Sequence, residues 1–230
     1  NDAPTASNNT VTTNEDTDHT FAASEFGFTD VDGDSLDHVS IETLPSNGTL
    51  LLSGVAISAG DQISAANISN LVFRPAANAN GASYDTFTFT VNDGTTDSAS
   101  SYTMTVDVTA VNDAPTASNN TVTTNEDTTY TFTASDFGFS DVDGDTLSSV
   151  TVSALSGSDG TFLLNGVAIT GSTSVTKTQI DSGLLTFVPD SNENGSSYNT
   201  FTFTVNDGTT DSASSYTMTV NVTAVNDAPT

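Results

Sequence analysis

The sequence predicts an all-β protein of two tandem seven-stranded β-sandwich domains arranged end to end. Two observations support this prediction. The chain contains two copies of one domain-sized unit, and within each copy apolar residues alternate with threonine or serine over short stretches. A period of two places successive side chains on opposite faces of a strand, and no stretch shows the longer period of an amphipathic helix.

The duplication is visible when the two halves are compared directly. Residues 10–17 recur as residues 121–128, and residues 87–94 recur as residues 201–208. The offset between the copies grows from 111 to 114 positions, so we expect a three-residue insertion in a loop of the second copy. Two copies of this size indicate tandem domains and not a solenoid of short repeats. The predicted domains are residues 1–111 and 112–225, with the start of a further linker at residues 226–230.

The boundary between the copies carries a motif that also opens and closes the chain. Asn-Asp-Ala-Pro-Thr occurs at residues 1–5, 112–116 and 226–230. Its proline fixes its own φ and biases the preceding alanine towards extended backbone, so we expect a stiff linker. Because the chain begins and ends inside this motif, we expect it to be a segment of a longer protein.

Seven strands are expected in the first copy. The clearest is residues 84–92, where Phe87, Phe89 and Val91 alternate with threonine and share one buried face. Seven short strands separated by turns, in about 110 residues, describe an immunoglobulin-like sandwich, although the chain has no cysteine or tryptophan. The other expected strands are residues 10–13, 19–23, 37–43, 49–52, 70–74 and 100–109.

The charge balance is extreme. The chain has 29 acidic residues, two basic ones (Arg74 and Lys177) and a formal net charge of -27. Nucleic acid and anionic membrane surfaces are therefore poor partners. Two basic residues are too few to neutralise the acids by salt bridges, so bound divalent metal is the simplest source of positive charge. The alternative explanation of the acidic clusters is that their charge only keeps the protein soluble. No apolar run approaches the ~20 residues of a membrane span, so no membrane insertion is expected.

Many of the acids gather in a few loops. Residues 30–34 read Asp-Val-Asp-Gly-Asp and recur as residues 141–145. Crowded carboxylates repel one another, and a calcium ion removes that penalty. The loop is not an EF-hand, because its sixth and twelfth positions are Ser35 and Ile41. Asp-Gly-Asp is also ordinary turn chemistry, so the motif alone leaves both interpretations open.

Sandwich topology adds other oxygens to these loops. The loop after the second strand and the turn before the last strand should lie at the N-terminal end of each domain, and the loop between the first two strands at the opposite end. The calcium ligands expected where the copies meet are Glu15, Asn112, Asp113, Asp141, Asp143 and Asp207. The equivalent ligands at the two outer ends are Asn1, Asp2, Asp30, Asp32, Asp93, Glu126, Asn226 and Asp227. Further ligands, or else turn and capping residues, are Asp34, Asp145, Asp16 and Asp127.

These motifs resemble the cadherin-like repeats of large bacterial RTX-type adhesins and, more distantly, cadherin ectodomains. In cadherins a glutamate near the domain start, an Asp-x-Asp loop, an aspartate before the last strand and an acidic linker hold calcium. Glu15, Asp30 with Asp32, Asp93 and their copies match the first three elements. The linker matches only in its Asn-Asp pair, so the resemblance implies fewer ions per joint or a different arrangement.

The function implied by this resemblance is structural. We expect a calcium-rigidified extender segment of a bacterial adhesin that is secreted or anchored at the cell surface. Its cofactor would be Ca²⁺ and its partners the neighbouring repeats of the same chain, with homophilic or glycan contacts elsewhere in the parent protein.

Other functions are less consistent with the residues. An enzyme is not expected, because His19 and His38 have no counterparts in the second copy and no Gly-x-Ser-x-Gly elbow occurs. A calcium-dependent carbohydrate-binding or homophilic adhesion module is the alternative, with Phe26 and Phe28 as the ambiguous aromatic pair beside the acidic loop. A Lys-Asn isopeptide is excluded in the first copy, which has no lysine.

Overall fold

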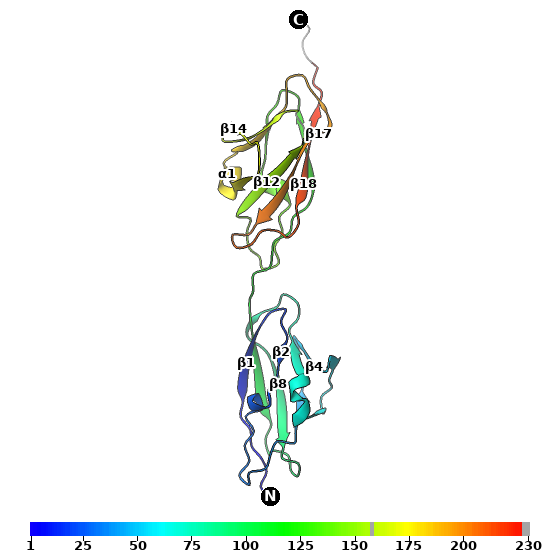
Figure 1. The fold of residues 1–230 in the computed structure, drawn as a ribbon, viewed down its shortest axis with the longest axis vertical. Coiled ribbons are helices and arrows are strands. Elements are labelled where there is room, and N and C mark those ends of the chain that lie inside the picture. The colour runs from blue at the N-terminus through cyan, green and yellow to red at the C-terminus, as the bar shows by residue number, and fades with distance from the viewer. Residues whose placement is uncertain (157–158, 227–230) are drawn as a thin grey trace. The chain divides into compact units, whose positions relative to one another are not determined.

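The computed structural model describes residues 1–156 and 159–226. The chain divides into two compact units, Asn1–Val111 (unit 1) and Asn112–Thr230 (unit 2). Each unit is a sandwich of two β-sheets (Figure 1). Among the predicted site residues Asp227 lies outside the described residues, as does most of the predicted third linker.

Unit 1 consists of a five-stranded and a four-stranded sheet. In the larger sheet the strand Asn9–Asn14 runs parallel to its neighbour Tyr102–Thr109, and all the other strand pairs in both sheets are antiparallel. The larger sheet has the order β1 (Asn9–Asn14), β9 (Tyr102–Thr109), β8 (Gly81–Asn92), β3 (His38–Thr43) and β6 (Gln62–Ser64). The smaller sheet has the order β2 (His19–Thr20), β7 (Leu71–Arg74), β4 (Thr49–Leu52) and β5 (Val55–Ala56).

Unit 2 repeats this topology, as the repeated sequence requires. Its larger sheet has the order β10 (Asn120–Asn125), β18 (Tyr216–Thr223), β17 (Gly195–Asn206), β12 (Ser149–Ser156) and β15 (Thr173–Thr176). Its smaller sheet has the order β11 (Tyr130–Thr131), β16 (Leu185–Val188), β13 (Thr161–Leu164) and β14 (Val167–Ala168).

Helical structure is limited to single turns. Three 3₁₀ helices are η1 (Ala23–Phe26), η2 (Ala65–Asn70) and η3 (Ala134–Phe137), and one short α-helix is α1 (Lys177–Asp181). In η1 the Glu25 carboxylate accepts the N–H of Ala22 at 2.9 Å, which starts the turn and directs Phe26 into the core. Among the described residues no helix is long and apolar enough to cross a membrane.

The seven predicted strands are present, but the count of seven is wrong, because the described part of each unit forms nine. The additional strands are β5 and β6 in unit 1 and β14 and β15 in unit 2. β13 and β14 are joined by Asn165 and Gly166 with φ of 51° and 76°, the left-handed pair of a tight hairpin. The strand expected at residues 19–23 ends at Thr20, because η1 begins at Ala23.

A separate phenylalanine-rich core supports each unit. The predicted inward face of β8 is confirmed, because Phe87, Phe89 and Val91 are fully buried. Phe87 meets Phe21 edge to face at a centroid distance of 5.6 Å, and Phe89 meets Phe26 in the same way at 4.9 Å. These contacts join the two sheets and fix the start of the acidic loop that follows η1.

Candidate metal centre

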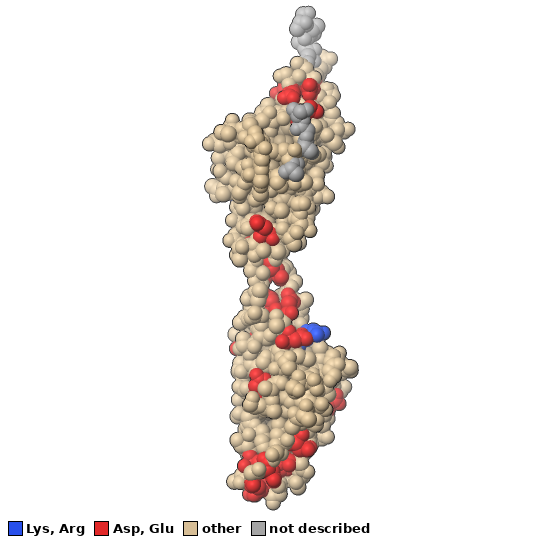
Figure 2. All heavy atoms as spheres, in the orientation of Figure 1, with Lys and Arg blue, Asp and Glu red and all other residues tan. Residues whose placement is uncertain are grey.

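Acidic side chains concentrate at the end of unit 1 that carries the N-terminus, as Figure 2 shows on one face. We call this the entry end, and in unit 1 it comprises residues 1–2, 30–34 and 92–97. The entry end of unit 2 comprises residues 112–113, 141–145 and 206–211. The opposite end, called the exit end, comprises residues 14–18, 78–81 and 109–111 in unit 1 and residues 125–129, 192–195 and 223–225 in unit 2.

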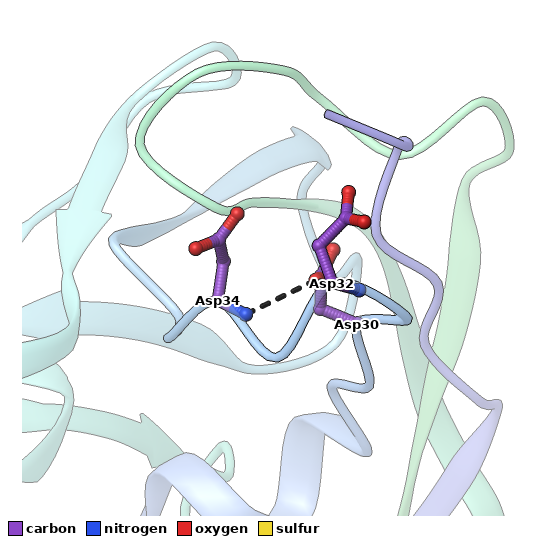
Figure 3. Close-up of side chains that lie close together, drawn as sticks. All are labelled: Asp30, Asp32 and Asp34. Carbon is purple, nitrogen blue, oxygen red and sulfur yellow. Dashed lines mark hydrogen bonds between the residues drawn. The ribbon is translucent and has the colours of Figure 1, made fainter.

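The acidic loop at the entry end wraps around its first carboxylate. Oδ1 of Asp30 accepts the N–H groups of Asp32 at 2.8 Å and of Asp34 at 3.1 Å (Figure 3). Gly33, with φ of 84°, supplies the left-handed turn that this wrapping requires. One oxygen from each of the three carboxylates therefore lies within 4.8 Å of the others.

Unit 2 repeats the arrangement. Oδ1 of Asp141 accepts the N–H groups of Asp143 at 2.9 Å and of Asp145 at 3.1 Å. These three aspartates also form a cluster whose oxygens lie within 4.8 Å of one another. The geometry is therefore a property of the repeated sequence and not of one copy.

In each loop, one buried carboxylate oxygen lacks a hydrogen-bond partner among the described residues. Oδ2 of Asp30 and Oδ2 of Asp141 are buried, and neither makes a hydrogen bond to any residue that the structure describes. A buried, unpaired carboxylate oxygen is costly, because burial removes its water without replacing it. The surrounding donor set consists of carboxylate and amide oxygens, which suits a hard cation such as Ca²⁺.

The linker residues of unit 1 join its entry end. The N–H of Asp2 donates to Oδ2 of Asp32 at 2.5 Å, and Nδ2 of Asn1 donates to Oδ2 of Asp93 at 2.8 Å. A backbone bridge between Thr5 and Thr29 holds the two segments in register. The structure thus brings together Asn1, Asp2, Asp32 and Asp93, which come from three separate stretches of the chain.

Unit 2 shows the same contacts. The N–H of Asp113 donates to Oδ2 of Asp143 at 2.7 Å, and Nδ2 of Asn112 donates to Oδ2 of Asp207 at 3.0 Å. The topological part of the prediction is therefore confirmed within each unit, because the acidic loop and the turn before the last strand meet the N-terminal segment.

Hydrogen bonds keep the turn aspartates ionised. The Asn1 amide, followed by the N–H groups of Thr96 and Thr95, holds the pKa of Asp93 below its usual value. Burial acts to raise the pKa of Asp207, but hydrogen bonds from Asn112 and from the N–H groups of Thr210 and Thr209 outweigh it and lower the pKa. Both carboxylates are thus available as anionic ligands at neutral pH.

Replacing Asp93 with asparagine should remove part of the pH dependence of the free energy of unfolding of unit 1. Because folding lowers the pKa of Asp93, its stabilising effect is complete above its unfolded value of 3.8 and is lost as the pH falls through the lower folded value. Urea unfolding in chelator should therefore show wild type more stable than Asp93→Asn at pH 6, with the difference shrinking below pH 3.8. A difference that stays constant from pH 6 to about pH 2 would contradict this assignment.

Within each unit the predicted glutamate lies at the exit end, opposite the acidic loop of the same unit. Glu15 and Glu126 follow β1 and β10 and are only 3% and 6% exposed. Hydrogen bonds from the N–H of Val111 and the amide of Asn80 lower the pKa of Glu15, although burial opposes them. Oδ1 of Asp16 accepts the N–H of Asn78 at 3.0 Å, and Oδ1 of Asp127 accepts that of Asn192 at 3.2 Å. Asn226 is exposed.

Two functional details were not foreseen. Asn80 and Asn194 lie in the loops that precede the long strands β8 and β17, and each donates its amide to the buried glutamate of its unit. Asp85, 5% exposed, accepts backbone N–H groups from the loop between β3 and β4. A single acid inside an otherwise Thr/Phe-alternating strand was the available sequence signal for Asp85.

The aromatic pair beside the acidic loop is largely covered. Phe26 and its copy Phe137 are fully buried, and Phe28 and Phe139 are partly buried against the core of their unit. The two histidines pair with local carboxylates, His19 with Glu25 and His38 with Asp37, outside the acidic loops. Within the described structure, the side chains gathered at the acidic loops are therefore oxygen ligands, and neither histidine lies among them.

Comparisons with known proteins agree with the fold. Residues 1–109 and 112–223 each match the family described as Bacterial Ig domain. No curated protein matches the chain. The crystal structure of human protocadherin-24 EC1-2 aligns with a TM-score of 0.57 at 17% identity, over 100% of both chains.

Two other solved structures align with lower TM-scores. Drosophila N-cadherin EC1-4 aligns with a TM-score of 0.46 at 14% identity, over 96% of this chain and 50% of that one. An endo-fucoidan hydrolase from glycoside hydrolase family 107 aligns with a TM-score of 0.30 at 21% identity, and the chain spans 29% of its length. At 17% identity, the similarity to the protocadherin-24 structure indicates the fold alone. Because the family matches cover nearly all of both units, the chain belongs to the bacterial Ig domain family and carries two copies of the domain in tandem.

Proposed function

We propose that the chain is a calcium-stiffened spacer segment of a bacterial surface adhesin, located outside the cell and without enzymatic activity. The observation that supports this most directly is the buried, unpaired oxygen of Asp30 and of Asp141. Each belongs to a three-carboxylate loop in a chain of net charge -27. A bound cation satisfies the oxygen and reduces the repulsion at the same time.

The proposed ligands of unit 2 are oxygens at its entry end. Asp141, Asp143 and Asp207 supply carboxylates, while Asn112 and Asp113 supply side-chain oxygens from the linker; Asp145 lies in the same loop. In unit 1 the corresponding ligands are Asn1, Asp2, Asp30, Asp32 and Asp93, with Asp34 in the loop. Bound there, Ca²⁺ supplies positive charge to these carboxylates, whereas the two basic residues of the chain pair elsewhere, Arg74 with Asp18 and Lys177 with Asp181.

The proposed stiffening depends on a ligand from the preceding unit. Glu15 accepts the N–H of Val111, which directly precedes Asn112 in the chain. We propose that Glu15 also ligates the calcium of unit 2, and that Glu126 does so for Asn226 and Asp227. An ion shared in this way favours one orientation of consecutive units, because bending separates its ligands. A spacer needs this property and a catalyst does not.

The alternative of a carbohydrate-binding or homophilic module lacks a specific observation in its favour. The aromatic side chains beside the acidic loop pack against the core, so no exposed ring platform of the kind that stacks on sugars is formed there. Calcium-dependent binding on a glycan array would support that alternative instead.

The test is the effect of calcium on interdomain distances in solution. With a spin label on each unit, calcium should narrow the distance distribution of the wild type, and chelator should broaden it. Asp143→Ala should stay broad in calcium, whereas Asp181→Ala, which removes an acid on α1 outside both ends, should behave as wild type. Distributions that superimpose in calcium and in chelator would refute the spacer mechanism.

A further inference from the structure

Both oxygens of the Glu15 carboxylate accept hydrogen bonds within unit 1. Its Oε1 accepts the N–H of Val111 at 2.5 Å, and its Oε2 accepts the amide of Asn80 at 3.0 Å. Its backbone N–H donates to the carbonyl of Thr109 at 2.9 Å. A buried carboxylate requires hydrogen-bond donors, and here both are neutral groups, a backbone N–H and a side-chain amide.

The same arrangement recurs in unit 2. Oε1 of Glu126 accepts the N–H of Val225 at 2.6 Å, Oε2 accepts the amide of Asn194 at 3.1 Å, and the backbone N–H donates to Thr223. Two copies that differ elsewhere in sequence therefore keep the same three contacts. The residue held in each case lies two positions beyond the end of the last strand, β9 or β18.

The loops that carry these groups are shaped for the contact. Asp16, next to Glu15, has φ of 55°, and Asn78, whose N–H it accepts, also has φ of 55°. The equivalent Asp127 and Asn192 both have φ of 56°. Non-glycine residues adopt this conformation at a cost, so the surrounding hydrogen bonds must stabilise it.

We propose that Glu15 and Glu126 are positioning residues that hold Val111 and Val225, the residues directly before the linker motifs, by a hydrogen-bond latch independent of metal. In this latch the carboxylate fixes the N–H of Val111 or Val225, and Asn80 or Asn194 orients the carboxylate. The exit segment of each unit is thereby ordered before any ion binds. This role goes beyond the proposed calcium binding, because it operates in chelator and within a single unit.

The latch should protect two exposed backbone amides from hydrogen exchange. Val111 and Val225 are both 45% exposed and lie outside the strand ladders, so their amides would ordinarily exchange nearly as fast as in an unstructured peptide. With the latch closed, both amides should be protected in hydrogen exchange measured by NMR in excess chelator. Rates equal to those of unstructured peptide, or protection that appears only with calcium, would overturn the proposal.

Variants separate the latch from a general loss of stability. Glu15→Ala should speed exchange at Val111 by about 10- to 100-fold, the factor expected for losing a hydrogen bond to a charged acceptor. Val225 in the same molecule is the matched control and should not change, and Glu126→Ala should reverse the pattern. The core amides of Met104 and Val106 exchange through global unfolding. If their exchange rates in Glu15→Ala rose as much as that of Val111, the faster exchange would reflect a general loss of stability, and the latch proposal would be overturned.

The conservative variant distinguishes positioning from metal ligation. Glu15→Gln keeps an oxygen that accepts the N–H of Val111, and its amide donates to Asn80 once the Asn80 amide turns over. Protection of Val111 in chelator should therefore survive in Glu15→Gln but not in Glu15→Ala. Asn80→Ala should give an intermediate loss. Equal loss in the Gln and Ala variants would show that no hydrogen-bond latch is present.

Discussion

Adding 10 mM calcium should raise the melting temperature of each unit by about 10 °C. A ligand at 100 times its Kd stabilises the folded state by ~2.7 kcal/mol, and 10 mM calcium reaches that ratio for a Kd of ~10⁻⁴ M, the tight end of the range of extracellular calcium modules. For a domain of this size that free energy corresponds to a shift of about 10 °C. The physical source is the pairing of the buried oxygens of Asp30 and Asp141 together with relief of carboxylate repulsion. Differential scanning calorimetry with and without chelator measures the shift.

Asp141→Asn provides the matched comparison for this prediction. It should abolish the calcium-induced shift of unit 2 and leave that of unit 1, whereas Asp30→Asn should do the reverse. Glu42→Gln removes one charge from an exposed position on β3, away from both ends of unit 1, and should retain both shifts. Equal shifts in Asp141→Asn and Glu42→Gln would exclude Asp141 as a ligand.

Replacing Asp85 with alanine should destabilise unit 1 by about 2–4 kcal/mol. Oδ1 of Asp85 accepts the N–H groups of Ser46 and Thr86, both at 2.9 Å, and Oδ2 accepts those of Asn47 at 2.7 Å and Gly48 at 2.8 Å. Alanine leaves these donors without their charged acceptor and frees the loop between β3 and β4. Urea unfolding of the variant in chelator measures the loss.

Two variants identify the cause of that loss. Asp85→Asn keeps the size of the side chain but places an amide N–H₂ against two N–H donors whichever way it is oriented, so it should be nearly as damaging as alanine. In unit 2 the equivalent Asn199 accepts the N–H of Thr200 and donates to the carbonyl of Asp159. Asn199→Ala should therefore cost only about 1 kcal/mol. A harmless Asp85→Asn would show that packing, and not acceptance of hydrogen bonds, explains the role of Asp85.

The alternation of the long strands made much of the fold predictable. In residues 84–92 each Phe or Val is preceded by threonine, and a strand has only two faces, so the pattern alone assigns Phe87, Phe89 and Val91 to the core. The short strands β5 and β6 have no such pattern. They form because a tight turn at Ser53 and Gly54 and pairing with longer neighbours place them in a sheet.

The sequence was enough to predict at which end of each unit the candidate site residues lie. Strand order in a sandwich puts the acidic loop, the turn at Asp93 and the N-terminal residues at one end, and contacts of Asn1 and Asp2 with Asp93 and Asp32 agree with that placement. Topology does not reveal which oxygen of a carboxylate is left unpaired. The wrapped loop that uses Oδ1 of Asp30 twice and leaves Oδ2 buried is visible only in the folded chain.

By itself the sequence determined the two-fold repeat, the all-β character and the gathering of acids in loops, because repetition, side-chain alternation and charge are properties of the chain read along its length. Tertiary structure alone decided the partners of Glu15 and Asp85. Except for Thr86, which is adjacent to Asp85, those partners are distant in the sequence and lie at Val111, Asn80 and residues 46–48. A buried carboxylate takes whichever N–H groups the packing of loops brings within about 3 Å, and that packing depends on both sheets at once.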